Sequence, residues 1–186
     1  MKTALVIYAH GSEDIEVTAS ADILNRGGVK VTRAAVNDDG TKNVILAHGT
    51  VVVCDANIHD ITDTYDVIVI PGGLAGSEHC RDSHILIEKL KQQKAEGRLI
   101  AAICAAPGFV LQTHGLLANG VMATCYPGCN DQGIENLSAD GVVHDTNAHI
   151  ITGKGPGFAL DFGLTILEAL AGKDVRDSVA RGMLLK

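Results

Sequence analysis

The sequence has no tryptophan and few aromatic residues of any kind. Phenylalanine, tyrosine and tryptophan together make up 3% of its 186 residues. Proteins that bind single-stranded nucleic acid stack the bases on aromatic rings, so this shortage argues against such a function. The apolar fraction is nevertheless 46%. We therefore expect a core of valine, isoleucine, leucine and alanine, in a single domain that spans residues 1–186.

Long basic runs and long apolar segments are also missing. The net charge is −7, and an acidic chain is repelled by phosphate backbones and by anionic membranes. The first apolar run ends at Ala9 without a signal-peptide cleavage pattern, and no segment is apolar for long enough to span a bilayer. We therefore expect a cytoplasmic protein that has neither a membrane nor a specific nucleic acid among its partners.

The five cysteines are an odd number, which favours free thiols over a disulfide framework. They are Cys54, Cys80, Cys104, Cys125 and Cys129. The last two, together with a histidine, could suggest zinc, but the close pairs of ligands typical of structural zinc sites are absent. We expect no metal. Whether Cys125 and Cys129 pair under oxidation stays open.

Short apolar runs alternate with segments of helical periodicity, which predicts an α/β fold with a doubly wound, mostly parallel sheet and helices on both faces. The expected strands are 4–9, 30–36, 66–70, 99–103, 121–125 and strands within 142–152, with a hairpin at 43–54. The expected helices are 13–26, 82–96, 105–115, 158–170 and 173–185. Ser12 is the expected N-cap of the first helix, and Gly27-Gly28 should end it.

The carboxyl ends of the strands should form the ligand crevice, which directs attention to residues 9–16, 71–76 and 104–107. Cys104 follows a buried strand and precedes Ala105-Ala106-Pro107, whose small residues permit a tight strand-to-helix elbow. A thiol at a helix N-terminus is expected to favour the thiolate. A packed, inert cysteine is the alternative interpretation, and the local pattern does not decide between the two.

Three other segments could meet Cys104. Gly72 and Gly73 allow backbone N–H groups to approach an oxyanion or a carboxylate, although a simple tight turn would use the same residues. Glu16 lies in the first turn of a helix, either as a solvated acid or as a buried, protonated carboxyl bonded to the Cys104 sulfur. Gly155-Pro156-Gly157 could bring the backbone close to the elbow.

Taken together, these motifs resemble the DJ-1/ThiJ/PfpI superfamily and, within it, the bacterial YajL branch. The matching segments are 11–16, 65–73, 99–107 and 155–157. The resemblance implies a flavodoxin-like fold and a homodimer. It also implies that Cys104 is an oxidisable thiol at a strained elbow, and that Glu16 is a protonated carboxyl bonded to that thiol.

The resemblance also assigns residues around this pair. Gly72, Gly73 and Ala105 would supply backbone donors, and Arg26 matches a family arginine near the dimer-side rim of the site. Tyr126 stands in the pocket wall where some relatives have histidine, and His48 stands where the branch often has arginine. The protease-like branch has histidine directly after the cysteine, and amidotransferase relatives need a late His–Glu pair. Neither feature is present, which disfavours both activities.

The function that the resemblance implies is a cofactor-free, cysteine-dependent deglycase or glyoxalase. Its substrates would be methylglyoxal, glyoxal, or the proteins and nucleotides that these carbonyls modify, so that it protects against carbonyl and oxidative stress. The alternative is a redox-sensing chaperone in which Cys104 is oxidised and unfolded client proteins are the partners. Both hypotheses use Cys104 and Glu16, so the sequence leaves the choice open. A thiamine-pathway role, suggested by older family names, finds no phosphate-binding loop to support it.

Overall fold

The computed structural model describes residues 1–185, and its centre is a seven-stranded sheet in the order β10-β11-β7-β6-β1-β2-β5. Neighbouring strands are parallel except for β10, which is antiparallel to β11. The strands are β1 (Thr3–Tyr8), β2 (Lys30–Ala35), β5 (Ala56–Asn57), β6 (Val67–Ile70), β7 (Leu99–Ile103), β10 (Val142–Asp145) and β11 (Ile150–Gly153).

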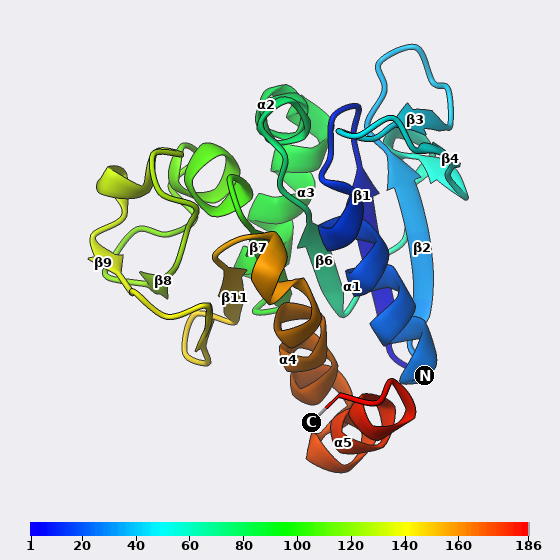
Figure 1. Ribbon diagram of the computed structural model, residues 1–186. Coiled ribbons are helices and arrows are strands. Elements are labelled where there is room, and N and C mark those ends of the chain that lie inside the picture. Colours follow the sequence, from blue (N-terminus) through cyan, green and yellow to red (C-terminus); the bar gives the residue numbers. More distant parts are fainter. Residues whose placement is uncertain (186) are drawn as a thin grey trace.

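Helices cover both faces of this sheet, so the predicted flavodoxin-like, doubly wound fold is confirmed (Figure 1). One layer contains α1 (Asp14–Arg26), α4 (Ala159–Ala171) and α5 (Lys173–Gly182), and the other contains α2 (Leu74–Asp82) and α3 (His84–Ala95). Short helical segments are η1 (Ile58–Asp60), η2 (Pro107–Gln112), η3 (Asp131–Gly133) and η4 (Pro156–Phe158). Two small sheets pair β3 (Asn43–Ile45) with β4 (Val51–Val53), and β8 (Met122–Ala123) with β9 (Asn136–Leu137).

The central strands are apolar along their whole length because both of their faces are buried. In β1, Leu5 and Ile7 belong to the core under α2 and α3, whereas Ala4, Val6 and Tyr8 belong to the core under α1 and α4. Successive side chains of a strand point to opposite faces, so a strand covered on both sides needs a continuous apolar run. Each fully buried Val, Leu or Ile contributes roughly 1.5–3 kcal/mol to folding.

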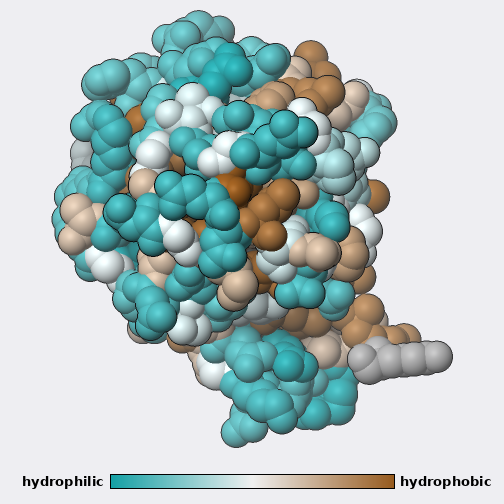
Figure 2. All heavy atoms as spheres, turned by 90° about the vertical axis from the view of Figure 1, so that its left-hand side faces the viewer, coloured by the Kyte–Doolittle hydropathy of each residue, from teal (hydrophilic) through white to brown (hydrophobic). Residues whose placement is uncertain are grey.

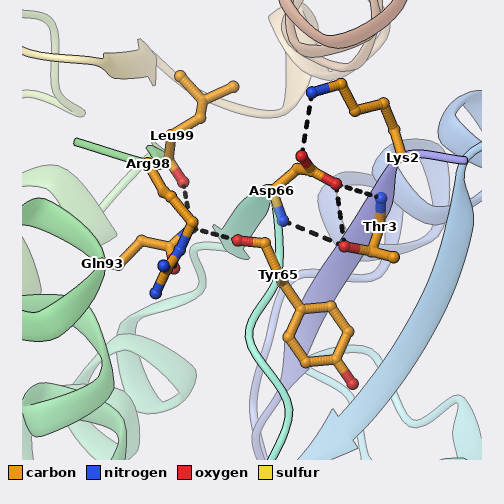
Figure 3. A network of polar contacts seen from close by, with 7 residues as sticks. All are labelled: Lys2, Thr3, Tyr65, Asp66, Gln93, Arg98 and Leu99. Atoms are coloured by element: carbon orange, nitrogen blue, oxygen red, sulfur yellow. Dashed lines mark hydrogen bonds and ion pairs between the residues drawn. The ribbon is translucent and has the colours of Figure 1, made fainter. Parts of the chain in front are cut away.

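Polar groups fasten the amino ends of the central strands (Figure 3). Asp66, just before β6, accepts hydrogen bonds from the backbone N–H of Thr3 at 2.8 Å and from its hydroxyl at 3.1 Å. The Gln93 amide, buried on α3, donates to the carbonyls of Tyr65 at 3.0 Å and Leu99 at 3.1 Å. These hydrogen bonds pair backbone N–H and C=O groups at the amino ends of the strands. The candidate site lies at the opposite, carboxyl ends.

Some predicted boundaries are wrong. The N-cap of α1 is Glu13 and not Ser12, whose hydroxyl instead accepts from the Ala9 N–H at 3.0 Å. The expected helix 82–96 begins only at His84, because Ser83 is extended and caps α3; a separate helix, α2, precedes it. The expected strand 121–125 is reduced to the two residues of β8.

The expected helix 105–115 is present only as η2, a six-residue π-helix, and the other predicted elements are confirmed with small shifts. Gly27 is the C-cap of α1, and the hairpin within 43–54 is present as β3 and β4. Among residues 1–185, no helix is both long enough and apolar enough to cross a membrane.

Candidate active site

The site begins with an unusual backbone conformation at Cys104. This residue directly follows β7, and its φ of 64° lies in the left-handed region, which costs a residue other than glycine roughly 1–2 kcal/mol. Two backbone bonds hold it there: the Cys104 N–H donates to the Gly153 carbonyl at 2.8 Å, and the Cys104 carbonyl accepts from the Tyr126 N–H at 2.8 Å. The thiol residue is only 8% exposed.

Glu16, on the first turn of α1, is completely buried beside this elbow. Its Oε2 accepts a hydrogen bond from the Gly72 N–H at 2.7 Å, whereas its buried Oε1 has no nitrogen or oxygen partner in residues 1–185. Burial raises the pKa of Glu16 to about 7, aided by the nearby charge of Glu13, although bonds from Gly72 and the Cys104 thiol act in the opposite direction. The carboxyl can therefore both accept and release a proton near neutral pH.

The start of α1 explains why Glu16 points inward. The Glu13 carboxylate caps the helix by accepting the Glu16 N–H at 2.8 Å, and the Glu13 N–H donates to the Gly72 carbonyl at 3.1 Å. The first turn is thus bonded to the loop after β6. With Glu16 also bound to Gly72, the two segments form a closed set of hydrogen bonds that fixes the carboxyl.

Glycine at position 72 makes the close approach possible. A Cβ atom on Gly72 would lie 2.4 Å from the Cβ of Cys104 and 2.6 Å from Oε2 of Glu16. Contacts this short do not occur between real atoms, so any side chain here would push the thiol and the carboxyl apart. The loop after β6 therefore packs against both groups and leaves no room for a side chain.

The electrostatics of the Cys104 sulfur differ from the sequence-based expectation. Burial raises the pKa of the Cys104 thiol, and the negative charge of Glu16 raises it further, whereas the N–H groups of Gly73 and Ala105 lower it. The expectation that a helix N-terminus favours the thiolate is thus wrong in sign, because desolvation outweighs the local donors. When Glu16 is protonated its charge no longer opposes the thiolate, so the two groups titrate as a pair.

The other predicted residues differ in how close they lie to the pair. Gly73 and Ala105 direct their N–H groups at the sulfur, but the Gly72 N–H is already bonded to Glu16. Arg26 is exposed at the far end of α1, about 15 Å along the helix axis from Glu16, where it forms a 2.7 Å ion pair with Asp22. This chain therefore does not bring its own Arg26 into the site.

Tyr126 lies beside the elbow with a side chain that is 47% exposed. Its backbone N–H binds the Cys104 carbonyl, and its ring packs over Gly155, whose hypothetical Cβ would meet the ring at 3.3 Å. The Gly155–Gly157 segment is thus close to the elbow through Tyr126.

Sequence reasoning missed Gly153 and Glu13. Gly153 could have been found from the carboxyl-edge rule, because it ends β11 and pairs with Ile103 of β7.

All five cysteines are free and buried. Within the described part of the chain, residues 1–185, no group of three or more His, Cys, Asp and Glu side chains is arranged to hold a metal ion. The chemically distinctive groups at the carboxyl edge are therefore one thiol, one buried carboxyl and two backbone donors.

The fold and this geometry define a class: doubly wound α/β proteins with a cysteine on a left-handed turn after a buried strand, next to a buried carboxyl. The chain belongs to the DJ-1/PfpI family, which it matches over residues 2–169.

The chain is similar to relatives over nearly its whole length. Protein dj-1beta of Drosophila melanogaster is 41% identical over 99% of this chain and 97% of the relative. The Caenorhabditis elegans protein named glutathione-independent glyoxalase DJR-1.2 is 36% identical over 99% of this chain and 97% of its own. The solved structure of oxidised Toxoplasma gondii DJ-1 has a TM-score of 0.94 at 40% identity and covers 100% of this chain and 99% of that one.

Proposed function

We propose that this protein is a cofactor-free, cysteine-dependent glyoxalase and deglycase. Its substrates are methylglyoxal and glyoxal, or the early adducts that they form on amines and thiols of proteins and nucleotides. The observation that carries the proposal is the Glu16 carboxyl, which burial brings to a pKa of about 7 beside the Cys104 thiol. The Caenorhabditis elegans relative named as a glutathione-independent glyoxalase supports the same chemistry.

In the first step, the ionised Glu16 accepts the proton of the Cys104 thiol. The resulting thiolate adds to the aldehyde carbon of the substrate, and the carbonyl oxygen becomes an oxyanion. The N–H groups of Gly73 and Ala105, which lower the pKa of the thiol, bind this oxyanion. Glu16 then gives the thiol proton to the oxyanion, which forms a hemithioacetal and returns Glu16 to its carboxylate form.

In the second step, Glu16 moves a proton between two carbons. As a carboxylate it removes the proton from the former aldehyde carbon and then delivers it to the adjacent former ketone carbon, while the hydroxyl proton of the hemithioacetal passes to the former ketone oxygen. The product is a thioester of Cys104 with a 2-hydroxy acid. Water hydrolyses this thioester, so the balance is methylglyoxal plus water to lactic acid, with no oxidant consumed. An adduct substrate releases its amine or thiol as well.

The test is lactate release from methylglyoxal by purified, chelator-treated protein. We expect release by the wild type and at least a 10³-fold loss in Cys104→Ala, because the nucleophile is removed. Cys54→Ala is the control: Cys54 is also a buried thiol with a pKa raised by burial, to about 11, and it should retain activity. Equal release by the wild type and Cys104→Ala would refute the proposed mechanism.

A redox-sensing chaperone remains the second candidate, because the same elbow would serve oxidation. Each step, from thiol to sulfenate and from sulfenate to sulfinate, takes one oxygen atom from peroxide and releases water. Oε1 of Glu16, which has no nitrogen or oxygen partner within residues 1–185, could bond the oxidised sulfur. No lactate release, together with selective sulfinate on Cys104 by mass spectrometry and binding of an unfolded client protein, would favour this function.

We also propose a homodimer in the cytoplasm, with α1 and the β3–β4 hairpin at the interface. The hairpin lies beside the start of α1, where the His48 N–H donates to Asp14 Oδ2 at 2.9 Å. Ile15, Val51 and Val53 are each more than half exposed in this region. An interface here would cover these apolar side chains. Sedimentation should give a dimer for the wild type and a monomer for Val51→Asp; a monomeric wild type would refute this assembly.

A further inference from the structure

A groove lies next to the elbow, on the same edge of the sheet. It has a volume of about 590 Å³, and its walls are formed by Tyr126, Pro127, Lys154 and Phe158 around the Gly155–Gly157 segment. The proposed mechanism uses none of these side chains. The groove is therefore a second feature of the edge that needs an explanation.

The aromatic side chains of this protein are distributed unevenly. The chain has only three tyrosines and three phenylalanines. Tyr8, Tyr65 and Phe162 are buried, and Phe109 is half-buried. Tyr126 and Phe158 are the exposed ones, at 47% and 39%, and both line the groove. Aromatic rings left in contact with water beside a reactive residue are typical of a surface that binds an apolar group.

Glycines seat both rings against the backbone. A Cβ on Gly141 would lie 2.1 Å from the ring of Phe158, and a Cβ on Gly155 would lie 3.3 Å from the ring of Tyr126. Each ring thus packs directly on a backbone that has no side chain in the way. A ring positioned in advance loses little conformational entropy when a ligand binds against it.

Hydrogen bonds at both backbone groups of Cys104, its N–H and its carbonyl, connect it to segments that line the groove or directly precede its wall. The Tyr126 N–H donates to the Cys104 carbonyl, and the Cys104 N–H donates to the carbonyl of Gly153, which directly precedes Lys154 of the groove wall. Both bonds are 2.8 Å long. These bonds place the backbone of the groove wall directly beside the backbone of Cys104.

The volume also exceeds the needs of the smallest substrates. A cavity of about 590 Å³ falls in the range of roughly 300–1,000 Å³ that binds drug-sized ligands. A three-carbon aldehyde would leave most of it filled with water. On the side that carries β8 and β9, Figure 2 shows a largely hydrophilic surface with hydrophobic atoms exposed in its middle.

We propose that this groove binds an aryl or similarly bulky apolar substituent on the ketone carbon of a 2-oxoaldehyde, so that aryl glyoxals are better substrates than methylglyoxal. This inference rests on the proposed function. Tyr126 and Phe158 are the residues that determine the specificity, because they offer ring faces to the substituent. Lys154 adds one positive charge at the groove, which suits the anionic 2-hydroxy acid product.

The test compares kcat/KM for phenylglyoxal and methylglyoxal. The wild type should prefer phenylglyoxal, and Tyr126→Ala and Phe158→Ala should each lower the phenylglyoxal-to-methylglyoxal ratio by about tenfold, mainly through KM. Tyr126→Phe keeps the ring and should keep the ratio. Leu137→Ala is the control, since Leu137 is 46% exposed on β9 and outside the groove. A ratio unchanged within twofold in both alanine variants would overturn the subsite.

A binding measurement separates this inference from the proposed function. Mandelate and lactate are the products expected from phenylglyoxal and methylglyoxal, and their dissociation constants can be measured by calorimetry or NMR without turnover. We expect mandelate to bind about tenfold more tightly than lactate, and this preference to disappear in Phe158→Ala. A wild type that shows this preference but turns over neither aldehyde would refute the proposed function and keep the subsite. Equal binding of the two acids would refute the subsite.

Discussion

Two buried thiols lie on opposite sides of one backbone elbow, and they differ in chemistry although not in burial. Cys104 is 8% exposed and Cys125 is 2% exposed, and burial raises the pKa of both. The Cys125 thiol donates to the carbonyl of Cys104 at 3.3 Å and is within 3.5 Å of the Cys129 carbonyl. Both acceptors are backbone carbonyl oxygens, which are too weakly basic to remove the thiol proton.

The Cys104 thiol instead faces a group that can take its proton. The Glu16 carboxyl lies beside it, and the N–H groups of Gly73 and Ala105 are aimed at the sulfur. A helix start or a buried strand end therefore does not by itself make a cysteine reactive. What distinguishes Cys104 is a neighbouring proton acceptor whose pKa is near the pH of the surrounding solution.

The largest loss of activity in this set is expected when the proton acceptor beside Cys104, Glu16, is removed. Glu16→Gln keeps the size and one hydrogen-bond acceptor but cannot exchange a proton, so we expect kcat/KM for methylglyoxal to fall about 10²- to 10⁴-fold. Peroxide should still oxidise Cys104 in this variant. Glu88→Gln, on the exposed surface of α3, is the control. Wild-type turnover by Glu16→Gln would show that another group moves the proton.

The buried carboxyl should also make folding stability depend on pH. Glu16 has a pKa of about 7 when folded and 4.5 as its ordinary value, so the folded state binds the proton more tightly between these two pH values. Its contribution is therefore complete below about pH 4.5 and is lost as the pH rises through 7, a loss of about 3 kcal/mol.

Urea denaturation at several pH values checks this effect. Because His144 and other groups also titrate, the quantity to measure is the difference between wild type and Glu16→Gln. The free energy of unfolding of the wild type should fall relative to the variant from pH 5 to 8. A difference that stays constant over this range would contradict the raised pKa of Glu16.

The tight contact at Gly72 can be tested by adding one methyl group. Gly72→Ala would place a Cβ 2.4 Å from that of Cys104, so we expect a loss of about 1–3 kcal/mol in the free energy of unfolding. Activity should fall too, because the thiol and the carboxyl separate. Gly157→Ala is the matched control, since its Cβ would meet no atom within 4 Å. Equal stability of the two variants would argue against the tight contact at Gly72.

The smallest effect is expected at the thiol behind the elbow. Cys125→Ala removes a hydrogen bond to the Cys104 carbonyl, but the Tyr126 N–H still binds the same oxygen at 2.8 Å. We therefore expect lactate release to stay within about threefold of wild type. A loss as large as that in Cys104→Ala would mean that both thiols take part in the chemistry, and the comparison would fail.

The central strands and the elbow position could be predicted because their signals are local. A strand buried on both faces needs a continuous apolar run, and residues 99–103 provide one directly before Cys104. The carboxyl-edge rule then selects the loops that the structure brings together around this residue. Neither inference requires knowledge of distant side chains.

The remaining features depend on contacts across the fold. Ser12 and Glu13 can both cap a helix, and only the docking of Ser12 on the Ala9 N–H decides between them. The sign of the Cys104 pKa shift depends on desolvation, which the sequence does not reveal. The aromatic groove joins residues about thirty positions apart, Tyr126 and Phe158, with no periodicity to link them.

Titration of the Glu16 carboxyl itself tests the proposed role of this residue without any substrate. A ¹³C NMR titration of the side-chain carboxyl carbon, assigned by its loss in Glu16→Gln, gives the pKa without any assumption about substrate. We expect a midpoint close to 7. A midpoint near 4.5 would mean that Glu16 is too weak a base to take the proton of the Cys104 thiol at neutral pH, and it would contradict the proposed mechanism.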